Sequence, residues 1–404
     1  MSLILNKKIF ILAGESSGDY IGSFLMDGLQ ERSNQKLTFF GVGGLLMQKK
    51  GLNNKFDMND LNIIGLVNSI YNYKKLRNYI NLLVELIMIE KPQAVITIDS
   101  KGFSLALAKK LKNVFKKSNY QCPLIHFVPP TIWAYGESRA KKWSKVHDGL
   151  FCLFKKEQDI FKKFNIECIY SGNPFIEKFL KEKINNVNIE KIKLKLSIGF
   201  KKNICLLLPG SRDSEIDYIL PEFINLIKCS KNTYKNLVWI LPTTKLQYPR
   251  IIKFLEKEKN TDDVKVIILD ENYEILKCAH LAIACSGTIT LELVLFNVPT
   301  IAVYKSDWLS AFFGRLIVDF KNVILPNFLI GKELIPLLFQ EKCTSYYLEK
   351  TLSNYLRTIQ TKKETFKLAS NKILSNMDYI KQQKSIFSRN SSKEIIKIID
   401  NFYN

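Results

Sequence analysis

Short apolar runs alternate with longer amphipathic segments along most of the chain. Each run stops at Gly, Pro, Asp or Ser, and the residues after it follow the 3.6-residue period of a helix. In the first half, the runs are 9–12, 94–98 and 124–128, and the helical segments are 19–32, 76–90 and 103–117. Fully apolar strands separated by helices are typical of parallel sheets that are covered on both faces.

The same alternation starts again in the second half of the chain. Its apolar runs are 204–208, 238–241, 264–269, 281–284 and 300–303. The pattern predicts two doubly wound α/β domains in series. Ligands of open α/β sheets bind at the carboxyl ends of the strands, so we expect the two domains to face each other across a cleft.

The domain boundary is expected after Gly172-Asn173-Pro174, because the segment 177–202 is rich in charge and poor in strand signals. This gives a first domain over 1–174 and a second over 175–345. Residues 346–404 read as polar helices with no further strand. The sequence leaves open whether these helices return to the first domain or cross to a partner chain in a homodimer.

Charge narrows the ligands that this protein would attract. The 404 residues include 60 Lys and Arg against 38 Asp and Glu, a net charge of +22. Such a surface attracts nucleotides, nucleic acid or an anionic bilayer, although a chain rich in Lys, Asn and Ile throughout would carry this charge without any functional demand. The hydrophobic content of 47% excludes a disordered chain.

The cysteines and the hydropathy of the chain indicate the cellular compartment in which we expect the protein. The eight cysteines form no CxxC pair, and several lie inside apolar runs, which indicates buried thiols of a cytosolic protein, not disulfides or a zinc site. No uncharged run reaches the roughly 18 residues of a membrane span. The first residues also lack the long apolar segment of a secretory signal.

A loop of small residues follows the first predicted strand. It contains Gly14, Glu15, Ser16, Ser17 and Asp19, without the spacing of a Walker A loop or a dinucleotide fingerprint. Two glycines let the backbone approach a ligand, and the amides of the next helix favour an anion or a group rich in hydroxyls. The alternative is a tight turn in which Asp19 caps that helix.

Two turns of the second domain have the form of anion sites. Ser211 and Arg212 follow the strand 204–208, where a guanidinium can hold a phosphate through two parallel hydrogen bonds. The alternative is a surface arginine paired with Asp213 or Glu215.

The second such turn is Ser286-Gly287-Thr288, which joins a strand to a helix and offers backbone donors and the positive end of the helix dipole. Glu292, about one turn into that helix, could accept from ribose hydroxyls. Ser286 could instead be an N-cap, and this role would coexist with phosphate binding.

Asp99 ends the apolar run 94–98 and is the candidate general base of the first domain, unless it caps the following helix. The histidines at 126, 147 and 280 lack metal-ligand spacing, and no nucleophile elbow occurs. Phosphate-binding turns, a carboxylate and no metal cluster favour transfer of a group from a nucleotide-activated donor.

Taken together and in this order, the motifs resemble the lipid-A-disaccharide synthase family, metal-independent glycosyltransferases of the GT-B fold with two Rossmann-like domains. The resemblance covers roughly residues 8–345. It rests on the segments 13–19, 41–44, 98–99, 130–135, 207–212, 286–288 with Glu292, and 325–327 with 331–333.

The resemblance implies an inverting transfer that needs no cofactor. UDP-2,3-diacylglucosamine would donate its sugar to the 6-hydroxyl of 2,3-diacylglucosamine 1-phosphate, giving UDP and a β-1,6-linked disaccharide 1-phosphate. Asp99 matches the family's proposed base and Arg212 an essential arginine. The second domain would take UDP, with Asn327 and Glu333 as further donor-side positions, and the first domain would take the acceptor.

Two positions depart from the family pattern. The second aspartate after the base is Gly102 here, and a histidine near the hinge is Asn173. Neither change removes Asp99 or Arg212, so we expect an active enzyme.

Two diacylated substrates require access to a bilayer. The apolar residues Ile63, Ile64, Leu66 and Val67 precede the basic group Lys74, Lys75 and Arg77, and Trp133 begins a second stretch, 133–164, that mixes aromatic and basic residues. We expect these stretches to bind the anionic inner face of the bacterial inner membrane from the cytoplasm. The alternative for each is a core helix beside a solvated lysine face.

Two rival functions remain. One is another GT-B enzyme that uses UDP-N-acetylglucosamine, such as a muramyl-peptide transferase or a 2-epimerase; the segments 14–19 and 129–135 argue against both. The other is a nucleic-acid-binding protein, for which the sequence shows no RRM, KH or helix-turn-helix signature. We therefore expect no nucleic-acid partner.

Overall fold

The structure is a computed structural model that divides into two compact units. It describes residues 8–33, 36–58, 70–132, 137–181, 188–259, 261, 264–269, 272–307, 323–375 and 386–404. The first unit comprises Met1–Lys178 with Met377–Asn404, and the second comprises Phe179–Asn376. The boundary thus lies within a helix, α9 (Pro174–Lys181), slightly after the predicted one.

The first unit is built on a sheet of seven parallel strands in the order β3-β2-β1-β4-β5-β6-β7. The strands are β1 (Lys8–Ala13), β2 (Thr38–Val42), β3 (Leu52–Asn54), β4 (Val95–Ile98), β5 (Leu124–Phe127), β6 (Gly149–Cys152) and β7 (Ile169–Tyr170). The helices are α1 (Ser16–Arg32), α2 (Leu45–Lys49), α4 (Ile70–Glu90), α5 (Lys101–Phe115), α7 (Glu137–Ser144), α8 (Lys155–Lys163), α9 and α19 (Ile386–Tyr403). The three predicted strands and the three predicted helices of this half all form.

The second unit contains six parallel strands in the order β10-β9-β8-β11-β12-β13. They are β8 (Asn203–Leu208), β9 (Leu237–Thr243), β10 (Val264–Ile268), β11 (Leu281–Cys285), β12 (Thr300–Tyr304) and β13 (Leu337–Phe339). The helices are α10 (Ile189–Lys195), α11 (Asp213–Ser230), α12 (Tyr248–Leu255), α13 (Ile275–Cys278), α14 (Ile289–Leu295), α16 (Leu325–Ile330), α17 (Ser345–Arg357) and α18 (Ile359–Ser375). Each of the five predicted runs is a strand, and the doubly wound α/β class is confirmed.

Burial on both faces explains why the strands are uniformly apolar. In β8, Ile204, Leu206 and Leu208 belong to one buried cluster, while Cys205 and Leu207 belong to the cluster on the opposite face. Successive side chains of a strand point to opposite faces, so a strand between two helical layers needs an apolar residue at every position. All eight cysteines are free, and Cys229 is the exposed one.

The strand order reverses once in each sheet, between β1 and β4 and between β8 and β11. At these points Ala13 pairs with Ile98 and Ala284 pairs with Leu208. The helices that follow the two neighbouring strands lie on opposite faces at such a point, which leaves room for a ligand at the strand ends. The candidate loops 14–19, 209–212 and 286–288 and residue Asp99 all follow these four strands.

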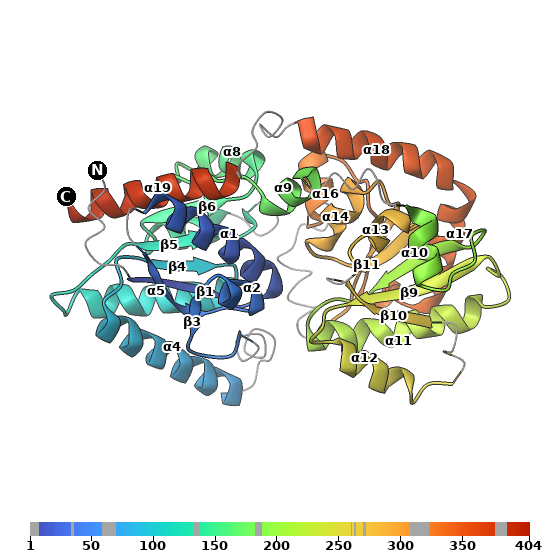
Figure 1. Cartoon of the computed structure of the whole chain (residues 1–404), viewed down its shortest axis with the longest axis horizontal. Coiled ribbons are helices and arrows are strands. Elements are labelled where there is room, and N and C mark those ends of the chain that lie inside the picture. Colours follow the sequence, from blue (N-terminus) through green and yellow to red (C-terminus); the bar gives the residue numbers. More distant parts are fainter. Residues whose placement is uncertain are drawn as a thin grey trace. The chain divides into compact units, whose positions relative to one another are not determined.

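The last helix, α19, packs against α1 of the first unit, as the red and blue helices of Figure 1 show. The Glu177 carboxylate accepts from the Phe387 amide at 2.5 Å, and the Ser388 hydroxyl donates to the Phe24 carbonyl at 2.9 Å. Gly28 lies so close to Ser388 that a Cβ there would overlap the Ser388 carbonyl. Residues 346–404 are therefore not one segment: α17 and α18 belong to the second unit, and α19 returns to the first.

The contact at Gly28 predicts a stability difference between two glycines. Gly28→Ala should lower the free energy of unfolding by about 1–3 kcal/mol, because the new methyl group displaces the start of α19. Gly102→Ala is the matched control: its Cβ would meet nothing within 4 Å, so stability should stay the same or rise by up to about 1 kcal/mol. Urea unfolding of both variants checks this, and a Gly28→Ala protein as stable as the control would contradict it.

Candidate functional site

Asp99 follows β4 directly and adopts a left-handed backbone conformation. Its φ is +50°, and that of Ser100 is +44°. The Asp99 amide donates to the Phe127 carbonyl at 3.0 Å, and the Ser104 hydroxyl donates to the Asp99 carbonyl at 2.8 Å. A left-handed residue other than glycine costs roughly 1–2 kcal/mol, which these contacts offset.

The Asp99 carboxylate remains accessible at the end of the strand. Its side chain is 24% exposed and lies 3.6 Å from the Lys101 ammonium. The N-cap of α5 is Ser100, so Asp99 does not occupy the capping position of this helix. The role of Asp99 as a general base stays a prediction.

The loop 14–19 passes beside the end of β4. Glu15 is the N-cap of α1, Ser16 is exposed, and Gly14 and Gly18 are buried. A Cβ on Gly18 would lie 3.2 Å from the Ala13 Cβ and 3.5 Å from the Ile98 carbonyl oxygen. The tight passage at this glycine brings the loop next to the residue that precedes Asp99.

The Asp19 side chain accepts hydrogen bonds from the backbone of α2, whereas the alternative considered from the sequence was a cap of α1. Its carboxylate is 5% exposed and accepts from the amides of Gly44 (2.9 Å), Leu46 (3.0 Å) and Met47 (2.9 Å). It therefore caps α2, not α1, and its oxygens are engaged within the protein. Asp19 holds the loop 14–19 on α2, and we no longer count it among the groups that contact an acceptor.

A buried polar pair of side chains lies near the end of β4, two residues before Asp99. Thr97 and His126 face each other in register on β4 and β5, with Oγ1 and Nδ1 2.8 Å apart. His126 Nε2 lies 3.3 Å from the carbonyl oxygen of Val128, a β-branched residue with a φ of +64°. The pair thus links the left-handed ends of two neighbouring strands. Apart from the histidine itself, no sequence pattern pointed to this pair.

Two aromatic rings cover this pair. The Trp143 ring lies 4.2 Å from the His126 ring and stacks on His147 at 4.9 Å. Burial lowers the pKa of His126 well below its usual value, and His147 and Lys101 lower it further. Burial also lowers the pKa of His147 to about 4. Both rings are therefore neutral at physiological pH.

Arg212 belongs to a tight turn that Glu215 organises. Gly210 has a φ of +117°, and the Glu215 carboxylate accepts from the amides of Ser211 (2.9 Å) and Arg212 (3.2 Å). The Arg212 guanidinium lies 3.6 Å from Glu215, and the Arg212 side chain is 33% exposed. The pairing considered as the alternative thus exists. The pairing with Glu215 leaves part of the Arg212 side chain accessible, and the guanidinium has five N–H donors, more than one carboxylate can accept.

The turn 286–288 presents its backbone to solvent. Gly287 and Thr288 are exposed, and the Ser286 amide donates to the Val303 carbonyl at 2.9 Å. Thr288 precedes α14 with helical backbone angles (φ −57°, ψ −32°) and makes no side-chain cap hydrogen bond, so the capping role considered for Ser286 stays a prediction. Gly287 accepts from the Thr290 hydroxyl at 2.7 Å, which fixes the start of the helix.

The two turns of the second unit follow neighbouring strands of its sheet, β8 and β11. Burial raises the pKa of the Cys285 thiol well above its usual value, Glu215 raises it further, and Arg212 lowers it. Cys285 immediately precedes the turn 286–288. Because Ala284 pairs with Leu208, both turns begin at the same edge of the sheet.

The remaining donor-side candidates differ in accessibility. Glu292 is half-buried and accepts from the Tyr273 hydroxyl at 2.5 Å, while Glu333 is exposed. Asn327 is 3% exposed; its amide oxygen accepts from Leu334 and Ile335, and its nitrogen donates to Ile335. Asn327 therefore holds the loop after α16, and its side chain is not available as a nucleotide ligand.

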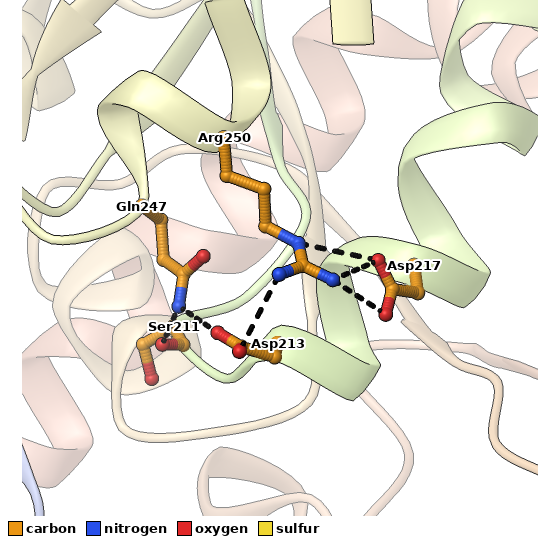
Figure 2. Close-up of polar contacts among 5 residues, drawn as sticks. All are labelled: Ser211, Asp213, Asp217, Gln247 and Arg250. Carbon is orange, nitrogen blue, oxygen red and sulfur yellow. Dashed lines mark hydrogen bonds and ion pairs between the residues drawn. The ribbon is translucent and has the colours of Figure 1, made fainter. Parts of the chain in front are cut away.

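Gln247 and Arg250, at the start of α12, are polar residues of this region that the sequence did not single out. Figure 2 shows Gln247 reaching Ser211 and Asp213, and Arg250 reaching Asp213 and Asp217. No motif marks them. A usable signal would have been the sheet order, because β9 lies beside β8 and so brings α12 next to the turn 209–212.

The residues expected to contact a membrane lie outside the described part of the chain. The membrane candidates Ile63, Ile64, Leu66, Val67 and Trp133 lie outside the described ranges. Within those ranges, no helix is long and apolar enough to cross a membrane. The described His, Cys, Asp and Glu side chains likewise form no group of three or more that could hold a metal ion.

The buried histidines predict a pH dependence of stability in the first unit. A folded pKa below the usual value of about 6.5 means that the unfolded chain binds the proton more tightly. Stability is therefore complete above about pH 6.5 and falls toward pH 4, by up to about 1.4 kcal/mol per pH unit for each histidine. His147→Gln should flatten this slope for amides of β4 and β5 in hydrogen exchange.

His280 supplies the control for that experiment. Burial also lowers its pKa to about 4, but it lies in the second unit, so His280→Gln should leave the slope at β4 and β5 unchanged. An unchanged slope in His147→Gln would contradict the prediction.

Comparisons with known proteins identify the family. The model of the family described as lipid-A-disaccharide synthetase matches residues 9–391. The lipid-A-disaccharide synthase of Rickettsia prowazekii (strain Madrid E) is 33% identical over 376 residues, which cover 92% of this chain and 95% of that protein.

Two solved structures are similar in fold. The S. aureus MnaA-UDP co-structure has a TM-score of 0.64 at 15% identity and covers 98% of this chain and 97% of that one. UDP-GlcNAc 2-epimerase from Neisseria meningitidis, bound to UDP-GlcNAc, has a TM-score of 0.60 at 14% identity, with 98% and 99% covered. At this identity the similarity shows the GT-B fold alone, whereas the family match carries the assignment. The chain belongs to the lipid-A-disaccharide synthase family, glycosyltransferases of lipid A biosynthesis.

Proposed function

We propose that the protein transfers 2,3-diacylglucosamine from its UDP derivative to the 6-hydroxyl of 2,3-diacylglucosamine 1-phosphate, with inversion at the anomeric carbon. The products are UDP and the β-1,6-linked disaccharide 1-phosphate. The observation that carries the proposal is the placement of Asp99, Arg212 and the turn 286–288 at the strand ends where each sheet order reverses. The family match supports the choice of substrates.

The donor binds to the second unit in this proposal. The exposed backbone of Gly287 and Thr288 and the guanidinium of Arg212 meet the diphosphate, and Glu292 meets the ribose hydroxyls. As the bond between the anomeric carbon and the phosphate oxygen breaks, the electron pair leaves with UDP. Donors that face this oxygen stabilise the charge as it develops, and such preorganised contacts are the largest single contribution in many enzymes.

The acceptor binds to the first unit. Asp99 accepts the proton of the 6-hydroxyl while the oxygen attacks the anomeric carbon on the face opposite UDP, which gives inversion. Asp99 suits this role because its carboxylate is accessible and its backbone is fixed at both the amide and the carbonyl. The exposed Ser16 and the half-buried Glu15 and Ser17 of the neighbouring loop are the candidate contacts to the acceptor sugar.

The rival functions find less support. A 2-epimerase shares the fold, but the similarity to a solved 2-epimerase stands at 14% identity, against 33% to a synthase over most of the chain. A nucleic-acid-binding function would rest on the net charge of +22 alone. Release of UDP in the presence of each candidate acceptor separates the enzymes, and oligonucleotide binding with a steep salt dependence would reveal the other class.

Substitution of the two proposed catalytic groups should abolish most turnover. Asp99→Asn and Arg212→Ala should each lower kcat by roughly 10²-fold or more, because both groups act on charge in the transition state. Asp27→Asn is the control, since it removes a carboxylate of α1 that pairs with Lys50 on the surface. Wild-type UDP release by both site variants would refute the assignment.

We also propose that the first unit binds an anionic membrane surface, since both substrates carry acyl chains. Lys74 and Arg77 are exposed at the start of α4. Each basic residue near such a surface contributes about 1 kcal/mol, so replacing both by Gln should weaken binding by roughly 30-fold. Lys201→Gln with Lys253→Gln, which alters two exposed lysines of the second unit, should change binding little.

Sedimentation with phosphatidylglycerol vesicles, at low and high salt and against phosphatidylcholine vesicles, measures this binding. We expect binding to the anionic vesicles at low salt that high salt reverses. Equal sedimentation of the Lys74/Arg77 variant and the control would show that the net charge is compositional.

A further inference from the structure

We propose that Gln247 and Arg250 are positioning residues for the nucleotide: Gln247 fixes the peptide between Ser211 and Arg212, and Arg250 neutralises two carboxylates beside Arg212. The inference rests on the donor site proposed above. It assigns a role in nucleotide affinity to the start of α12, a helix that contributes no group to the proposed chemistry.

The turn that is to meet a diphosphate lies beside an excess of negative charge. Asp213, Glu215 and Asp217 occupy the first turns of α11, directly after Arg212. Glu215 pairs with Arg212 and with two backbone amides. If Asp213 and Asp217 kept their full charge unopposed, they would repel an anionic ligand at the same helix end.

Arg250 opposes the charge of both aspartates. Its guanidinium makes a two-pronged contact with Asp217, with Nη2 at 2.6 and 2.7 Å from the two carboxylate oxygens, and its Nη1 lies 3.4 Å from Asp213 (Figure 2). The hydrogen bonds that Arg250 donates to Asp217 raise the pKa of Arg250. The three side chains are 42–63% exposed, so salt should screen their effect on a bound anion.

Gln247 acts on the backbone of the turn. It is 2% exposed, and its amide nitrogen donates to the Ser211 carbonyl at 3.2 Å and to Asp213 at 2.7 Å. The Arg212 amide, on the other side of the same peptide, donates to Glu215 at 3.2 Å. A peptide unit is planar, so these two contacts fix its orientation and with it the direction in which the Arg212 side chain leaves the backbone.

Gln247 is itself held in place by its own chain. Its amide nitrogen in the backbone donates to the Thr244 carbonyl at 3.1 Å, and Thr244 follows β9. Because β9 pairs with β8, the start of α12 is fixed relative to the turn 209–212. The pairing of β8 with β9 therefore sets the position of Gln247 relative to Arg212, the residue proposed to bind phosphate.

Calorimetric titration with UDP tests the charge compensation. At low salt, Arg250→Gln should weaken UDP binding by about fivefold, and the difference should shrink at high salt. Lys228→Gln is the matched control, because it breaks the ion pair with Glu258 that the far end of α11 makes at 2.6 Å. Uridine, which lacks the phosphates, should bind the wild type and Arg250→Gln equally.

A rescue experiment separates compensation of charge from a merely structural role. Adding Asp213→Asn and Asp217→Asn to Arg250→Gln should restore UDP affinity, because the uncompensated carboxylates are then gone. If Arg250 only braced the helices, the triple variant would be no better than Arg250→Gln. Arg250→Lys, which keeps the charge, should retain most of the affinity.

Gln247→Met keeps the size of the side chain and removes its hydrogen bonds. We expect UDP affinity to fall roughly tenfold and the KM for the UDP-sugar to rise, with kcat at saturation nearly unchanged. A fall in kcat with an unchanged KM would contradict a role in nucleotide positioning.

The outcomes distinguish this inference from the donor site on which it rests. If the wild-type protein does not bind UDP, both fail. If the wild type binds UDP and both Arg250→Gln and Gln247→Met bind it equally well, the donor site stands and the role of α12 is refuted.

Discussion

The register of parallel strands at the reversal of strand order is the constraint on which the rest of this structure depends. Ala13 beside Ile98 and Leu208 beside Ala284 bring together loops that are far apart in the sequence. Backbone hydrogen bonds between buried strands fix these neighbours, so the loops inherit their positions from the core of each sheet. The packing of apolar side chains between the strands and helices therefore sets where the polar groups at the strand ends lie, although these polar groups are not part of that packing.

Polar side chains then give several loops their shape. The buried Asp19, Asn327 and Gln247 and the partly buried Glu215 each bond to backbone groups of a loop. A buried backbone donor without a partner costs as much as a lost hydrogen bond, so these side chains select one loop conformation. Residues such as Asp19 and Asn327 thus hold the loops in place, while Asp99 and Arg212 remain accessible.

The strands and their order of alternation could be predicted from sequence because burial on both faces leaves a continuous apolar run, as in 204–208. Short edge strands such as β7, with two residues, leave no such signal. The position of a candidate residue was predictable where it follows a strand at once, as Asp99 follows β4, or after a short turn, as Arg212 follows β8, while the roles of both residues stay predictions. It was not predictable where the role depends on a partner from another element, since oxygen and amide groups that bind substrates are the same groups that cap helices. Asp19 resembled a ligand for this reason, Asn327 was a candidate only through the family resemblance, and no pattern in the sequence marked Gln247.

A crystal structure with UDP bound is the most direct test of the central claim that the strand ends of the second unit form the nucleotide site. We expect the diphosphate within hydrogen-bonding distance of the Gly287 and Thr288 backbone and of the Arg212 guanidinium, with Gln247 still bound to the Ser211 carbonyl. UDP bound elsewhere, or a turn 209–212 that has left Gln247 to reach the phosphates, would contradict it.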